Sequence, residues 1–78
     1  SMKELSEQEI IDLAYATYEP CLDITDELNI CIKSDDGGRH IEFSVENIEA
    51  AKYLRKEISH TFEGYRTIIR YRIDSSEQ

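Results

Sequence analysis

The sequence contains few cysteines and no long apolar run, and both shortages exclude classes of protein. Cys21 and Cys31 allow at most one disulfide, so the chain does not resemble disulfide-dense small secreted domains, and we expect two free thiols. No apolar run approaches the roughly 20 residues of a membrane span, and the N-terminus lacks a signal-peptide pattern. We therefore expect a soluble, cytoplasmic protein that does not associate with membranes.

Ligand-binding patterns are also missing. There is no C-x-x-C pair, and His40 and His60 fall in separate predicted elements, so we expect no metal site. The acidic loop 19–27 lacks the D-x-D-x-D-G spacing of a calcium loop. Gly37 and Gly38 join two predicted strands and do not open a helix, which argues against a nucleotide-phosphate loop. We expect no cofactor.

The length and composition predict one small domain over residues 1–78. Its 40% apolar and 33% charged residues are ordinary globular values. A chain of this size buries only about 60% of the surface that it exposes when unfolded, which leaves little room for a deep active site. If Met2 is the natural start, Ser1 is left over from cloning, and we expect residues 74–78 to be a frayed tail.

The first 27 residues predict a helix and an acidic connection. Ser6 and Glu9 have the spacing of a capping box, which predicts a helix over residues 7–18 that ends before Pro20. Residues 19–27 follow as a loop, in which we expect Leu22 and Ile24 to anchor the chain to the core.

A hairpin is the clearest signal in the sequence. Two stretches of alternating apolar and polar residues surround Asp36 and Gly37, which predicts pairing of Ile30 with Phe43 and of Ile32 with Ile41.

A second helix and a last strand complete the chain. The helix is predicted to begin at Asn47 or Ser44 and to end at Gly64, in the left-handed conformation that often follows a helix. Residues 65–73 then alternate as a strand, with its tyrosines, Ile69 and Ile73 expected to face the core.

These elements predict an α+β two-layer sandwich in the order α-β-β-α-β. We expect a three-stranded, entirely antiparallel sheet with the third strand beside the first (spatial order 3-1-2), and both helices on one face.

The formal net charge of −8 is unevenly distributed. Residues 1–51 hold thirteen acids and three Lys or Arg, whereas residues 52–78 hold six Lys or Arg and four acids. Repulsion among like charges destabilises a folded protein, and a basic partner that binds the charged surface relieves it. We therefore expect a non-catalytic protein-binding module, an inhibitor or adaptor, that docks on a basic protein surface. A narrower hypothesis within this one is that the module competes there with nucleic acid. The expected partner-binding residues are Glu9, Asp12, Glu19, Asp23, Asp26, Glu27, Asp35 and Asp36.

Arginines at alternate positions of the last strand suggest a second hypothesis. Placed on the open face of the sheet, they form a candidate site for an anion or for single-stranded nucleic acid, with the residues Lys33, His40, Arg66, Arg70 and Arg72. Charged residues on an edge strand also serve simply to discourage pairing with another chain. The negative net charge argues against direct nucleic-acid binding, while the charge asymmetry allows head-to-tail self-association.

Enzymatic activity is not expected. His40 is the best candidate for a catalytic group, but no nucleophile, orienting group and oxyanion donors can be assembled around it. An exposed surface histidine is the simpler interpretation.

Overall fold

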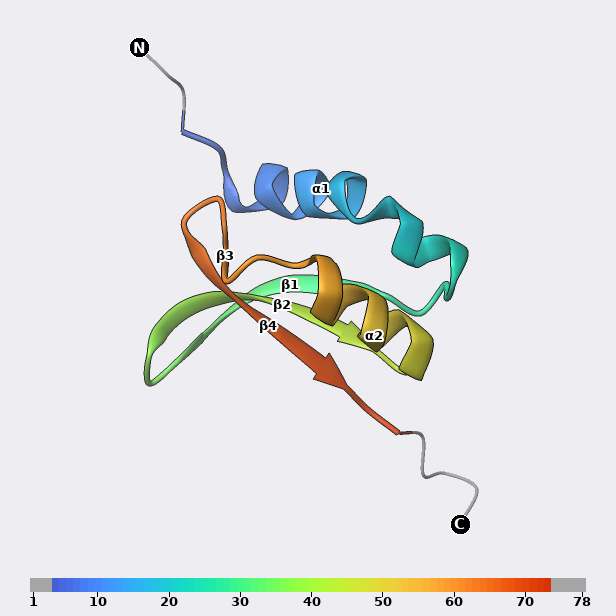
Figure 1. Ribbon diagram of the computed structural model, residues 1–78. Coiled ribbons are helices and arrows are strands. Elements are labelled where there is room, and N and C mark those ends of the chain that lie inside the picture. Colours follow the sequence, from blue (N-terminus) through green and yellow to red (C-terminus); the bar gives the residue numbers. More distant parts are fainter. Residues whose placement is uncertain (1–3, 74–78) are drawn as a thin grey trace.

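The computed structural model describes residues 4–73 as two helices packed on one side of a four-stranded sheet, an α+β fold (Figure 1). The predictions for Ser1 and for residues 74–78 lie outside this range. Along the chain the elements are α1 (Glu7–Thr17), a 3₁₀ helix η1 (Glu19–Asp23), β1 (Asn29–Asp35), β2 (Gly38–Val45), α2 (Ile48–Glu57), β3 (Thr61–Phe62) and β4 (Tyr65–Tyr71).

The capping box of α1 is confirmed. Ser6 Oγ accepts a hydrogen bond from the Glu9 amide, and the Glu9 carboxylate accepts one from the Ser6 amide. These bonds satisfy two of the amides that the start of a helix leaves without intrahelical partners. The apolar stripe of α1 then buries Ile10 and Ala14.

The hairpin register is confirmed as well. Ile30 lies opposite Phe43 and Ile32 opposite Ile41, around a turn at Asp36 and Gly37. Phe43 is fully buried and meets the ring of Tyr18 edge-on, with the ring centroids 5.4 Å apart. The hairpin, both helices and the 3₁₀ helix thus share one core, in which the fully buried Cys21, Ile41, Val45 and Leu54 also lie.

The predicted strand order was wrong. The sheet has the order β1-β2-β4-β3, so β4 lies beside β2, and the two are parallel. The ten residues of α2 cross over from the end of β2 to the start of β4, which is the connection that neighbouring parallel strands require. β2 is an inner strand with a neighbour on each side, and it has a continuous buried run from His40 to Val45.

The predicted end of the second helix was also wrong. Asn47, not Ser44, caps α2 by accepting the amides of Glu49 and Ala50. The helix stops at Glu57, and the chain then forms the two-residue strand β3, which pairs with the start of β4. Glu63 and Gly64 both have positive φ, at 50° and 86°. Gly64 therefore serves a tight hairpin turn, where two left-handed residues match the twist of the strands, and does not end a helix.

Two further expectations about anchoring residues failed. Leu22 and Ile24 are exposed, because the 3₁₀ turn directs Cys21 into the core in their place. Ile73 lies beyond β4 and is exposed, although Tyr65, Ile69 and Tyr71 pack against the core as predicted. Within residues 4–73, no helix has both the length and the apolar character needed to cross a membrane.

Candidate functional site

Most of the candidate residues lie on two surfaces of the described chain. The first is the acidic surface, which we define by six exposed carboxylates on α1, η1 and the loop before β1: Glu9, Asp12, Glu19, Asp23, Asp26 and Glu27. The second is the helix-free face of the sheet, which carries the arginines of β4.

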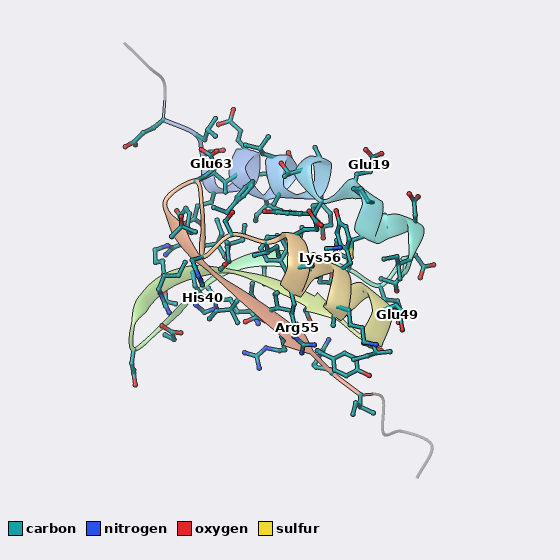
Figure 2. The ribbon with its side chains drawn as sticks, in the orientation of Figure 1. Glu19, His40, Glu49, Arg55, Lys56 and Glu63 are labelled. Carbon is teal, nitrogen blue, oxygen red and sulfur yellow. The ribbon has the colours of Figure 1, made fainter. Side chains whose placement is uncertain are left out.

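The acidic surface follows α1 and η1 on the side of the molecule away from the sheet (Figure 1). Because α1 ends at Thr17, Glu19 belongs to η1 and does not continue the α-helical stripe of Glu9 and Asp12. Figure 2 shows Glu19 pointing away from the sheet, at the junction of the two helices. Residues 4–27 contain eight acids and no Lys, Arg or His. One of these acids, Glu7, forms an ion pair with Arg39 of β2.

Large apolar side chains are exposed within this acidic stretch. Leu13, Leu22 and Ile24 retain 39%, 42% and 38% of their accessible surface. The sequence predicted that Leu22 and Ile24 lie in the core. This prediction was wrong because residue types alone do not indicate which side chains of a short 3₁₀ helix face inward. Carboxylates interspersed with exposed aliphatic groups give this surface both a charge and an apolar component.

Asp35 and Asp36 do not belong to the acidic surface. They lie at the β1–β2 turn, at the opposite end of the molecule from η1 (Figure 1). Asp35 accepts the Gly37 amide at 2.8 Å and the Arg66 guanidinium at 2.7 Å. These bonds, that from Gly37 above all, lower the pKa of Asp35. Asp35 therefore holds the turn and the start of β4 together.

The helix-free face is organised around a buried carboxylate. The side chain of Glu42, on β2, is only 3% exposed. Arg70 donates to it through Nε (3.2 Å to Oε2) and Nη2 (3.3 Å to Oε1), and Lys33 Nζ donates to Oε2 at 3.2 Å. The hydrogen bonds from Arg70, with help from Lys33 and His40, hold the pKa of Glu42 at about 2, against the opposing effect of burial.

His40 is buried beside this cluster, so its expected position as an exposed surface residue was wrong. Its Nε2 lies 3.4 Å from Glu42 Oε1, and its Nδ1 lies 3.4 Å from Asp35 Oδ2 without the geometry of a hydrogen bond. Figure 2 shows His40 near the start of β2. Both charged neighbours of the ring are carboxylates.

The expected orientation of the arginines is confirmed. Arg66, Arg70 and Arg72 are exposed, and each lies near a carboxylate: Asp35, Glu42 and, at 3.8 Å, Glu46. A pocket of about 300 Å³ lies over β1, β2 and β4, where Asn29, Cys31, Ser44 and Arg72 surround the ion pairs of Glu42. Sequence reasoning missed Glu42 as the centre of this face, because its contact with Arg70 depends on β4 lying beside β2.

In the described part of the chain, no group of three or more His, Cys, Asp or Glu residues has an arrangement that could hold a metal ion. No protein-family model matches this sequence, and no curated protein or solved structure matches it significantly.

Proposed function

We propose that this protein is a non-catalytic, acidic binding module, an inhibitor or adaptor that docks through its acidic surface on a basic surface of a partner protein. The observation that carries the proposal is the run of eight acids without a base over residues 4–27, on a surface where large aliphatic side chains are also exposed. Each of these two features contributes a separate argument.

The first argument is electrostatic. Glu7 of this stretch forms an ion pair with Arg39. Repulsion among the exposed carboxylates of η1 and the loop that follows it, Glu19, Asp23, Asp26 and Glu27, opposes folding, and a basic partner would relieve it while accelerating encounter.

The second argument is the exposed apolar area. A surface that only had to keep the protein soluble would carry polar residues. Leu13, Leu22 and Ile24 are instead exposed, and their apolar side chains would leave water if a partner surface covered them. Protein interfaces combine apolar and polar groups, and both kinds of side chain are exposed along this stretch. This combination favours a protein partner over a small cation.

The partner's basic surface is proposed to be one that also binds nucleic acid. Carboxylates spaced along a helix and the following turn can occupy positions that phosphates take in the competing complex. This more specific proposal rests only on charge, and it predicts that added DNA or RNA displaces the partner.

Binding of an anion by the helix-free face remains the second candidate. The pocket of about 300 Å³ beside Arg70 and Arg72 favours it. The cations of this face are, however, largely matched by Asp35, Glu42 and Glu46, which reduces the attraction left for a phosphate. We therefore rank this candidate below the acidic surface.

The experiment is affinity capture from the native host with nuclease-treated lysate, at low and high salt. The test variant is Asp12→Asn/Glu19→Gln/Asp26→Asn, which spares Glu9 because that residue caps α1. The matched control, Asp36→Asn/Glu49→Gln/Glu57→Gln, makes the same change in net charge at other exposed positions.

We expect the test variant to lose the salt-sensitive partner and the control to retain it. A second variant, Leu22→Ser, should weaken capture without changing the charge. If both triple variants capture the partner equally well, the acidic surface is not the docking site.

A further inference from the structure

The two edges of the sheet differ in how well they are protected. At β1, the Tyr15 hydroxyl of α1 accepts a hydrogen bond from the Ile30 amide at 3.1 Å and lies 3.4 Å from the Leu28 carbonyl oxygen, to which it donates. These two backbone groups at the start of that edge are thereby occupied. At the other edge, β3 pairs only with Arg66 and Tyr65 at the start of β4.

The direction of the backbone groups along β4 follows from two hydrogen bonds. The Thr67 amide donates to the His60 carbonyl oxygen, away from β2, while the Arg72 amide donates to the Val45 carbonyl oxygen of β2, each at 3.0 Å. Backbone groups alternate sides along a strand, so the amides and carbonyls of Ile69 and Tyr71 point away from β2. Within residues 4–73, no backbone group pairs with them. We call this stretch, residues 68–72, the open edge.

Cations surround the open edge on both sides of the sheet. Arg70 and Arg72 flank it on the helix-free face, and each guanidinium retains exposed N–H donors beyond those directed at its carboxylate. On the opposite face α2 packs against β4, and its last turn carries the exposed Arg55 and Lys56. Figure 2 shows Arg55 projecting from α2 on the side of β4.

We propose that the open edge binds an extended, acidic segment of a partner protein as an added β-strand. The backbone of the segment would pair with the amides and carbonyls of Ile69 and Tyr71. Its acidic side chains, at alternate positions, would lie beside Arg70 and Arg72, and the intervening apolar side chains would lie on the side of Ile69 and Tyr71. This surface is separate from the acidic surface, and the proposal does not depend on the function proposed above.

A second copy of this chain is a poorer occupant. Antiparallel pairing of β4 with another β4 around Arg70 would place like charges opposite each other, which is destabilising in a cross-strand pair. Four of the six residues of the acidic surface of a second copy lie on α1 and η1, which are helical and cannot add a strand. Charge complementarity therefore favours an extended acidic segment from another protein.

The probe is a fluorescently labelled peptide of eight residues in which Glu and Val alternate. Its control has the same composition in two blocks, four Glu followed by four Val, which removes the alternation. Anisotropy titrations at low salt measure binding, and amide hydrogen exchange, read residue by residue by NMR, reports which backbone groups become protected.

We expect the alternating peptide to bind and to slow exchange at Ile69 and Tyr71 by about tenfold or more, while the amides of Arg70 and Arg72 change little because β2 already protects them. The variant Arg72→Glu, beside the end of β2, should weaken binding by about tenfold. The control Arg39→Glu makes the same change in net charge at the start of β2 and should keep the affinity within about twofold.

Three outcomes would overturn the proposal. The first is equal binding of both peptides, and the second is binding without new protection at Ile69 and Tyr71, which would indicate a contact through side chains alone. The third is protection that rises with protein concentration in the absence of peptide, which would identify a second copy as the occupant.

Discussion

Arg70 donates to both oxygens of the Glu42 carboxylate, through Nε at 3.2 Å and Nη2 at 3.3 Å. The pair joins β2 to β4 across their parallel register, on the face that no helix covers. A two-point contact of this kind fixes the orientation of the guanidinium as well as its distance. Glu42 therefore lies buried on this face beside the buried His40 and Ser44, because the longer side chains of Lys33 and Arg70 cover it.

Replacing this carboxylate is expected to destabilise the fold. Glu42→Gln keeps the shape but leaves Lys33 and Arg70 without their counter-ion, and a buried amide must then satisfy its own hydrogen bonds. We expect a loss of about 1 to 3 kcal/mol in the free energy of unfolding, measured by urea denaturation at pH 7. Asp36→Asn, at the exposed hairpin turn, should change it by less than about 0.5 kcal/mol.

Stability should depend on Glu42 at acid pH. Its pKa is lowered to about 2 from an ordinary value of 4.5, so its contribution is complete above pH 4.5 and is lost as the pH falls toward 2. The linked free energy is about 3 kcal/mol as an upper limit, because the half-exposed Lys33 and Arg70 are screened by water. Asp35, whose pKa is also lowered, acts in the same direction.

The measurement is the difference in unfolding free energy between the native protein and Glu42→Gln, followed from pH 6 to pH 2. Taking the difference removes the opposite effect of the acidic surface, whose repulsion is relieved by protonation. The difference should shrink as the pH falls. A difference in unfolding free energy that stays constant from pH 6 to pH 2 would contradict the lowered pKa of Glu42.

Tyr15 is expected to protect the edge of β1. Tyr15→Phe removes the hydroxyl that accepts the Ile30 amide, and we expect a loss of about 1 kcal/mol with faster hydrogen exchange at Ile30. Tyr53→Phe is a matched control, because Tyr53 is also partly buried and its hydroxyl forms no hydrogen bond in the described structure. If Ile30 exchanges at the same rate in both variants, another group protects that edge.

Local signals in this sequence predicted local structure well. The capping box at Ser6 and the alternation around Asp36 and Gly37 each involve residues close in the chain, and both were correct. The register of a hairpin is strongly constrained, since a slip by one residue would move every apolar side chain to the wrong face.

The errors concern the placement of one element against another. Alternation in residues 65–73 identifies a strand and its inward face, but it does not say whether β1 or β2 is the neighbour. Gly64 suits the end of a helix and a tight hairpin turn equally, because both require positive φ. The Glu42 cluster depends on the correct strand order, so it was beyond reach from residue types alone.

The two cysteines are expected to differ in reactivity. Cys21 is fully buried in the shared core, and burial raises the pKa of its thiol, so the reactive thiolate is scarce as well as inaccessible. Cys31 is partly exposed on the helix-free face, beside the pocket that contains Glu42. With an aromatic disulfide reagent at pH 8, the thiol of Cys31 should therefore react quickly, and the thiol of Cys21 only as fast as the fold opens. Cys31→Ser should remove the fast phase and Cys21→Ser the slow one, while mild urea should accelerate only the slow phase. A fast phase that survives in Cys31→Ser would mean that η1 does not hold Cys21 in the core.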